Sequence, residues 1–199
     1  MPGKSLAAHA SAAPHRHHLG ERLRQLRKHR QLTLKALSER SGVALSTLSK
    51  IELGQISVSY EKLAATARAL GADIGELFDP RASAAPAAAP RVVRSTIEES
   101  PRYDSDSYDY RMLATGFAGK RMTPLHGRIV ARRTDEFADF VRHPGQEFVI
   151  VLKGRVRLCF ETGETVDLKR LETAYFDSGI GHIYLSTGAG DAEVLVVMS

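Results

Sequence analysis

The segment from Thr33 to Gly54 constrains the fold of this chain more than any other, because it predicts two short amphipathic helices joined by a tight turn. Thr33 precedes the first helix, where its hydroxyl can accept a hydrogen bond from a backbone N–H of the first turn. Gly42 follows that helix at a position that needs a left-handed backbone, which glycine adopts most easily. Leu48 and Ile51 recur at i and i+3 and predict the buried face of the second helix. The segment therefore predicts a helical hairpin.

The opposite face of the second predicted helix is free to enter a groove in a partner. It carries Leu45, Ser46, Ser49 and Lys50. A hairpin with this spacing is typical of the helix-turn-helix, whose second helix lies in the major groove of DNA. A helical hairpin with no role in DNA binding is the alternative interpretation.

Three further helices are predicted around the hairpin, within residues 19–79. Their buried positions are Leu19, Leu23 and Leu26 before the hairpin, Leu63, Ala64, Ala67 and Leu70 after it, and Ile74, Leu77 and Phe78 at the end. Ser59 is the expected cap of the fourth helix, and Gly71 closes it. With the segment LRQLRKHRQLTLKALSERSGVALSTLSKIELGQ, this five-helix pattern resembles the Xre or lambda-repressor-like family of DNA-binding domains.

The resemblance implies double-stranded DNA as a partner, bound by a homodimer whose two recognition helices reach major grooves about 34 Å apart. We expect Ser46 and Lys50 to contact base edges, and Leu45 to contact an apolar group such as a thymine methyl. The contacts expected to phosphates come from Thr33, Thr47, Ser49 and Gln55.

Some positions of the helical segment follow the family pattern and others depart from it. The family pairs an arginine of its first helix with a glutamate after the recognition helix, and those positions hold Arg27 and Glu52. Two solvated charges are the alternative interpretation of that pair. The departures are Leu34 in place of a frequent phosphate-contacting Gln, Ala44 in place of a Ser or Thr cap, and Leu45 in place of a frequent base-reading Gln.

Charge and composition divide the chain into parts. Residues 1–80 carry 12 Lys and Arg against 7 Asp and Glu, whereas residues 81–199 carry 16 of each, so the net charge of +5 belongs to the helical part. A basic surface attracts the phosphate backbone. We expect residues 1–18, rich in Ala and His, to be a disordered tail that could also scavenge metal, and the Ala/Pro-rich residues 80–91 to be a linker.

No apolar run is long enough to span a membrane, and the first residues lack the apolar core of a signal peptide. The lone cysteine, Cys159, excludes an intramolecular disulfide, and we interpret it as a small core or surface residue of a strand. These features predict a cytoplasmic protein, and the type of helical domain suggests a prokaryote.

Residues 92–199 change from helical to strand periodicity. Short segments rich in β-branched and aromatic residues are separated by turn residues such as Gly154 and Thr162-Gly163. The predicted strands are Tyr108–Leu113, Arg128–Arg133, Glu147–Leu152, Arg155–Phe160, Glu164–Leu168, Ala174–Phe176, His182–Leu185 and Val194–Met198. Many short strands in about 100 residues predict an antiparallel sandwich or barrel.

Within this domain, HPGQEFVIVLKGRVRL followed by AYFDSGIGHIYL resembles the two motifs of the cupin family, which are small jelly-roll β-barrels. The resemblance implies a fold of α then β: a five-helix DNA-binding domain followed by a cupin barrel. The family's second His, its Glu and its last His fall on His143, Glu147 and His182. Its first His falls on Val141, and a usual Gly-Asp pair falls on Leu171 and Glu172.

Two imidazoles and one carboxylate with open positions are the ligand set of non-haem Fe(II) sites, and they also suit Zn, Mn or Ni. His143 and Glu147 differ by an even number, so a regular strand places them on one face. A domain that has lost its metal, with the three residues lining a ligand pocket, is the alternative. His126 is a further candidate for the ligand missing at Val141.

The combination resembles a class of bacterial transcriptional regulators in which a cupin domain senses a small-molecule effector and changes DNA binding. Two other functions stay open. One family of iron-dependent epoxidases joins a similar helical domain to a cupin and uses a His, a Glu four residues later and a distant His. In the other alternative, the cupin binds a ligand and the helical domain serves only for dimerisation.

Overall fold

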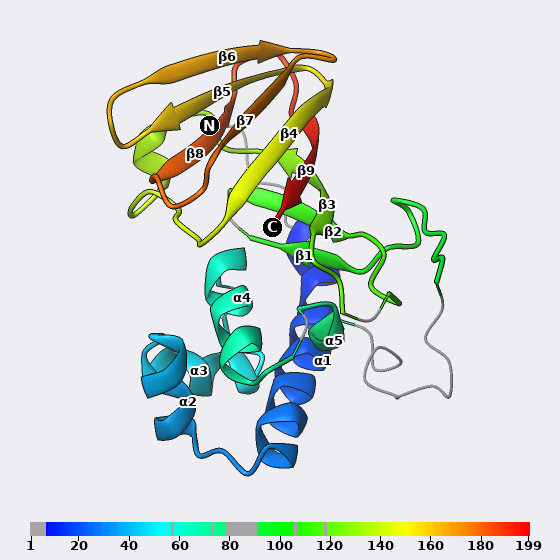
Figure 1. Cartoon of the computed structure of the whole chain (residues 1–199), viewed down its shortest axis with the longest axis vertical. Coiled ribbons are helices and arrows are strands. Elements are labelled where there is room, and N and C mark those ends of the chain that lie inside the picture. Colours follow the sequence, from blue (N-terminus) through cyan, green and yellow to red (C-terminus); the bar gives the residue numbers. More distant parts are fainter. Residues whose placement is uncertain (1–6, 57, 73, 79–90, 106, 118) are drawn as a thin grey trace. The chain divides into compact units, whose positions relative to one another are not determined.

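The computed structural model describes residues 7–56, 58–72, 74–78, 91–105, 107–117 and 119–199. The chain forms two compact units, residues 1–88 and 89–199, of which the first holds the α-helices and the second the β-strands (Figure 1). The predicted linker, residues 80–91, lies outside the described residues except for Arg91. Among the helices described, none is both long enough and apolar enough to cross a membrane.

The first unit contains the five predicted helices. They are α1 Ala7–His29, α2 Leu34–Ser41, α3 Leu45–Glu52, α4 Tyr60–Ala69 and α5 Gly75–Phe78. Every apolar position predicted to be buried from Leu19 to Leu77 is buried, with Leu23, Leu37, Leu48 and Leu63 fully enclosed. Ser59 occupies the N-cap of α4 as predicted, but its side chain makes no capping hydrogen bond.

The first helix begins earlier than predicted, and it packs closely against α3. The tail of residues 1–18 was expected to lack regular structure, whereas α1 already begins at Ala7. The high helix propensity of alanine accounts for the extension. Further along, a Cβ added at Gly20 would lie 2.3 Å from the carbonyl oxygen of Ile51. Glycine therefore lets α1 approach α3 backbone to backbone.

The second unit consists of two antiparallel sheets, which confirms the predicted sandwich or barrel. The strands are β1 Arg102–Asp104, β2 Tyr108–Met112, β3 Thr123–Ile129, β4 Gln146–Lys153, β5 Arg155–Phe160, β6 Thr165–Lys169, β7 Thr173–Asp177, β8 His182–Ser186 and β9 Ala192–Met198. A six-stranded sheet has the order β1-β2-β3-β9-β4-β7, and a three-stranded sheet has the order β6-β5-β8. Fully buried residues such as Leu125, Val149, Leu158 and Val194 form the core between them.

The one misplaced strand is β3. The prediction placed a strand at Arg128–Arg133, whereas β3 occupies Thr123–Ile129 and so includes Pro124 and Gly127. Both residue types normally argue against a strand. A Cβ at Gly127 would lie 3.2 Å from Val194 and 3.5 Å from Tyr110, so neighbouring strands fill the space that a side chain would take. The three-residue strand β1 was not predicted.

Leu171, one of the departures from the cupin motif, adopts a strained backbone. Its φ is 67° in the turn between β6 and β7, and its side chain is 60% exposed. A left-handed conformation costs a non-glycine residue about 1–2 kcal/mol, part of which glycine's larger unfolded-state entropy offsets. We therefore expect Leu171→Gly to raise the free energy of unfolding by about 0.5–1 kcal/mol. Urea unfolding of the wild type and the variant measures this, and a destabilised variant would contradict it.

Candidate nucleic-acid interface and candidate metal centre

The hairpin of α2 and α3 is fixed by local hydrogen bonds. Thr33 Oγ1 accepts from the backbone N–H of Ala36 at 3.0 Å, as the sequence predicted. Gly42 has a φ of 71°, and its N–H donates to the Ser38 carbonyl. The Ser38 hydroxyl donates to the carbonyl of Val43 at 2.7 Å, which ties the end of α2 to the turn. These bonds set where α3 begins.

The outer face of α3 is accessible along its length. Leu45 is 46% exposed, Ser46 and Lys50 are exposed, and Thr47 and Ser49 are partly exposed. Thr33 and Gln55 lie exposed beyond the two helices. All seven residues expected to contact DNA are therefore at the surface. As the sequence indicated, Ala44 provides no side-chain cap for α3.

Arg27 and Glu52 form a nearly buried, two-bonded ion pair between α1 and the end of α3. Arg27 Nε lies 2.6 Å from Glu52 Oε1, and Nη2 lies 2.8 Å from Oε2. The two side chains are only 11% and 6% exposed, so the alternative of two solvated charges is wrong. Arg27 Nη1 also donates to the carbonyl of Leu32. Glu52 raises the pKa of Arg27, so this link between three segments stays charged.

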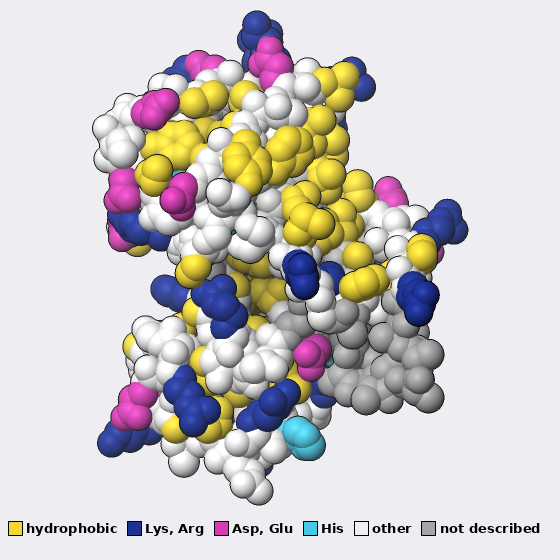
Figure 2. Space-filling model, viewed as in Figure 1, with side chains coloured by type: hydrophobic (Ala, Val, Ile, Leu, Met, Phe, Trp, Pro, Cys, Tyr) yellow, Lys and Arg dark blue, Asp and Glu magenta, His cyan; other side chains and the backbone are white. Residues whose placement is uncertain are grey.

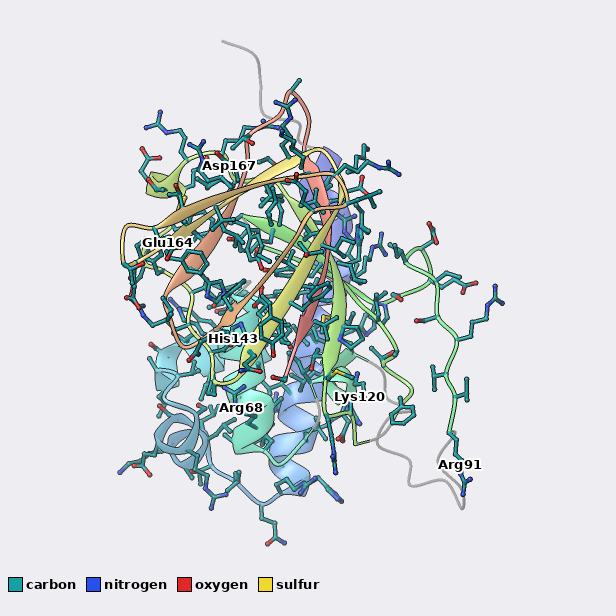
Figure 3. The ribbon with its side chains drawn as sticks, turned by 45° about the horizontal axis from the view of Figure 1, so that its top comes forward. Arg68, Arg91, Lys120, His143, Glu164 and Asp167 are labelled. Carbon is teal, nitrogen blue, oxygen red and sulfur yellow. The ribbon has the colours of Figure 1, made fainter. Side chains whose placement is uncertain are left out.

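In the second unit, His143, Glu147 and His182 come together. His143 precedes β4 (Figure 3), Glu147 lies on β4, and His182 begins β8 in the other sheet. One ligand atom from each residue lies within 4.8 Å of the others. His143 Nε2 is 2.9 Å and His182 Nε2 is 3.5 Å from Glu147 Oε2. All three side chains are buried.

Glu147 is ionised despite its burial. Desolvation raises the pKa of the carboxyl group, but hydrogen bonds to His143 and His182 outweigh it and lower the pKa to about 2. The hydroxyl of Tyr184 donates to Glu147 Oε1, and burial raises the pKa of this tyrosine well above its usual value. Tyr184 was not predicted, although its position two residues after His182 places it on the same face of β8.

The donor set fits a divalent metal ion. The Nδ1 atom of His182 lies 2.9 Å from the carbonyl oxygen of Ile180, which leaves Nε2 directed at Glu147. Such a second hydrogen bond commonly fixes the tautomer of a metal-binding histidine. Val141 pairs by backbone hydrogen bonds with His182 and supplies no ligand atom. His126 does not replace it, because its Nε2 lies 3.3 Å from Glu193 instead.

Aromatic side chains line the interior beside this group. The ring of Phe176 lies 4.9 Å from that of His182, and the ring of Tyr184 lies 6.3 Å from that of Tyr108. The ring of Tyr110 lies 5.5 Å from that of Tyr108 on the same face of β2, whereas the guanidinium of Arg111 donates to the Ser100 carbonyl from the other face. Of Tyr110 and Arg111, the interior residue is therefore Tyr110.

Comparison with known families supports both halves of this description. The model of a helix-turn-helix domain matches residues 18–79, and that of a cupin domain matches residues 133–198. The chain joins an Xre-like helix-turn-helix domain to a C-terminal cupin domain. The two domains predicted from the sequence, a helix-turn-helix domain followed by a cupin domain, are thereby confirmed.

Two solved structures are similar to this chain over most of their length. A transcriptional regulator of a helix-turn-helix family from Vibrio cholerae is 20% identical, with a TM-score of 0.66 over 94% of this chain and 98% of the other. The hydroxypropylphosphonic acid epoxidase of S. wedmorenis is 21% identical, with a TM-score of 0.49 over 92% of this chain and 97% of the other. The likeness to the Vibrio cholerae protein shows a common fold. No curated protein sequence matches the chain.

Proposed function

We propose that the chain is a sequence-specific transcriptional regulator whose cupin domain senses a small molecule or a metal ion. The observation that carries the proposal is the outer face of α3, which is accessible and polar apart from Leu45. The Arg27–Glu52 pair holds this helix against α1 without occupying its outer face. The net charge of +5 belongs to the part of the sequence that forms this domain. A DNA-bound regulator would act in the cytoplasm.

The proposed contacts follow from the chemistry of the exposed side chains. Lys50 suits the acceptors of guanine, Ser46 can donate to or accept from a base edge, and Leu45 can contact a thymine methyl. The remaining contacts are to phosphates and set the register of the protein on DNA; they come from Thr33, Thr47, Ser49 and Gln55. A homodimer would place two such helices about 34 Å apart, which predicts a two-fold symmetric operator.

In the cupin domain, His143, Glu147 and His182 would hold a divalent ion such as Fe, Zn, Mn or Ni. When bound, the ion supplies a Lewis-acidic centre for an oxygen or nitrogen donor of an effector. The aromatic rings around the group would contact the apolar part of such a molecule. An effector changes DNA binding only if it binds the DNA-competent and incompetent states with different affinity.

Fluorescence anisotropy tests the proposal, with DNA from upstream of the chain's own gene and scrambled DNA as probes. A specific regulator binds its site at least about 1,000-fold more tightly than random sequence at physiological salt. The comparison is repeated with protein supplied with Fe²⁺, Zn²⁺, Mn²⁺ or Ni²⁺. Equal, strongly salt-dependent affinity for both probes in all these states would contradict the proposal.

Lys50→Ala separates base reading from phosphate attraction. We expect the variant to lose about 1–3 kcal/mol of discrimination at one base position of the operator. Lys35→Ala is the matched control, because Lys35 is likewise an exposed lysine of the hairpin, and its ammonium lies 4.0 Å from Glu39 on the same helix. A loss that is the same for operator and scrambled DNA would show that Lys50 contacts only phosphate.

A second candidate function is a mononuclear non-haem iron enzyme of the cupin type, with the helical domain in a structural role. The buried group of two histidines and one carboxylate favours it, because this donor set leaves ligand positions open. DNA recognition separates the two functions: substitutions on the outer face of α3 would leave such an enzyme's activity unchanged. A cupin that binds a ligand and dimerises through its helices would likewise show no operator preference.

A further inference from the structure

Strand β4 reverses the usual polarity of a sheet at Glu147. Its outward side chains include Phe148 and Ile150, which are only partly buried, and Figure 2 shows hydrophobic side chains gathered over this strand and its neighbours. Glu147 points the other way, into the domain, and is 2% exposed. Burial of a carboxylate is unfavourable unless the group is paired and hydrogen-bonded. A position that breaks the local pattern in this way is where a binding function is expected.

The two carboxylate oxygens of Glu147 have different partners. Oε2 lies 2.9 Å from His143 Nε2 and 3.5 Å from His182 Nε2. Oε1 accepts a hydrogen bond from the hydroxyl of Tyr184. Because an ionised carboxylate can only accept hydrogen bonds, the hydroxyl is the donor. One oxygen of Glu147 therefore faces both imidazoles, and the other oxygen is held by the phenol of Tyr184.

Tyr184 itself is held in place from several directions. It lies on β8 two residues after His182, so both side chains point to the same face of the strand. Its backbone N–H donates to the hydroxyl of Tyr108, 2.8 Å away, which ties β8 to strand β2 of the other sheet. Its ring lies edge-on to those of Tyr108 and His182, with centroids 6.3 and 6.2 Å apart. Because a phenol hydroxyl moves only with its ring, these contacts keep the donor at Oε1.

The hydrogen bond from Tyr184 limits how Glu147 can bind a metal ion. A carboxylate binds a metal through one oxygen or through both. Two-oxygen ligation would require Oε1 to turn toward the ion and to give up the bond from Tyr184. While that bond is made, Glu147 offers Oε2 alone, next to Nε2 of His143 and Nε2 of His182. The group then supplies three ligand atoms, and a six-coordinate ion would keep three positions for an effector or water.

We propose that Tyr184 is a positioning residue that restricts Glu147 to one-oxygen ligation and thereby widens the preference of the site for Ni²⁺ and Zn²⁺ over Mn²⁺. The assignment depends on the metal centre of the proposed function. Imidazole ligands suit Ni and Zn, whereas carboxylate oxygens suit Mn. With one carboxylate oxygen, two of the three ligand atoms are imidazole nitrogens. A second oxygen would make nitrogen and oxygen equal in number and would favour Mn²⁺ relative to the other two ions.

Tyr184→Phe tests the assignment, because it removes the hydroxyl and keeps the ring. Calorimetric titration of the metal-free full chain with Ni²⁺, Zn²⁺ and Mn²⁺ measures the three affinities. We expect those for Ni²⁺ and Zn²⁺ to fall by about 10-fold, as when a hydrogen-bond partner of a metal ligand is mutated. The affinity for Mn²⁺ should stay within about 3-fold of the wild-type value, because the freed Oε1 can bind this ion as well. The ratio of Ni²⁺ to Mn²⁺ affinity therefore falls by at least about 3-fold.

Tyr110→Phe is the matched control, because Tyr110 is another tyrosine of the interior and its replacement leaves the three hydrogen-bond partners of Glu147 in place. All three affinities should stay unchanged in this variant. Infrared difference spectra between the Mn²⁺-loaded and metal-free chain report the ligation mode itself, since the two carboxylate stretches lie further apart for one-oxygen than for two-oxygen ligation. We expect the wider separation in the wild type and in Tyr110→Phe, and the narrower one in Tyr184→Phe. Bands that persist in Glu147→Gln belong to other carboxylates.

Several results would overturn the assignment. Two-oxygen ligation in the wild type contradicts it without any variant, so the test does not require Tyr184→Phe to fold. Equal loss of affinity for all three ions in Tyr184→Phe would show that the hydroxyl only stabilises the buried carboxylate, and the same change of ratio in Tyr110→Phe would remove the special place of Tyr184. A wild type that binds none of the ions would refute the metal centre and this inference together. Operator preference is measured separately and would still decide whether the chain is a regulator.

Discussion

Replacing Arg27 with methionine is expected to lower the free energy of unfolding of the helix-turn-helix domain by about 3–5 kcal/mol. The reason is the burial of its partner: Glu52 is 6% exposed and would keep a charge without a counterion. The variant also loses the hydrogen bond to the Leu32 carbonyl, 2.8 Å away, which joins α1 to the segment before α2. Urea unfolding followed at 222 nm measures the effect, because the described α-helices all lie in this domain.

A double variant distinguishes the free-energy cost of leaving Glu52 without a counterion from the cost of lost packing at Arg27. In Arg27→Met/Glu52→Met both charges are absent, and a buried ion pair replaced by apolar residues is often close to neutral. We therefore expect the double variant to recover at least half of the stability that Arg27→Met loses. A loss below about 1 kcal/mol in the single variant, the value of a solvated pair, would contradict the buried-pair description.

The helical domain was predictable because its signals are local. Thr33 and Gly42 act on backbone groups within a few residues of themselves, so sequence alone placed both ends of α2. The contact of Gly20 with the Ile51 carbonyl was not predictable, because it depends on how closely α1 and α3 approach. The extension of α1 to Ala7 was missed because an alanine-rich segment without apolar periodicity lacks the usual signal of a packed helix.

The strands were predictable where alternation and turns agree, as in β5, whose bounds match the prediction. The prediction failed at β3, because Pro124 and Gly127 are residue types that strands usually lack. Pairing with the neighbouring strands β2 and β9 stabilises this strand nonetheless. Sheet order also lies beyond local pattern: β9 begins at Ala192 and pairs with both β3 and β4, which end at Ile129 and Lys153.

For the candidate metal centre, motif resemblance supplied the three residues, and the structure brought them together. Tyr184 was missed because strand parity alone does not show that its hydroxyl reaches Glu147 across to the other sheet. His126 was an open alternative because the sequence does not show which groups a buried side chain lies beside. In the structure, its Nε2 lies beside Glu193 and not beside Glu147. A family pattern therefore identifies candidate ligands, whereas the hydrogen-bond partners of those ligands can be identified only in the folded structure.

Glu147→Gln and His182→Ala are each expected to weaken metal binding in the cupin domain by more than about 100-fold. Mutating a residue that only hydrogen-bonds to a metal ligand already lowers metal affinity by about 10–100-fold, and the loss of a ligand itself should cost more. Glu147→Gln keeps the size of the side chain and removes its charge. His182→Ala removes one imidazole of the pair whose ring centroids lie 5.5 Å apart. Calorimetric titration of the metal-free full chain with Zn²⁺, Mn²⁺ and Ni²⁺ measures the loss.

The control for these variants is His126→Gln, which removes a buried histidine of the same domain that lies outside the metal-binding group. It should bind metal as the wild type does, and it tests whether His126 supplies a ligand. If the four histidines among residues 1–18 also take up metal, the expected change is the loss of one binding event rather than of all binding. Unchanged affinity in both Glu147→Gln and His182→Ala would mean that the three residues form a hydrogen-bonded structural group, with Glu147 held ionised by its neighbours alone.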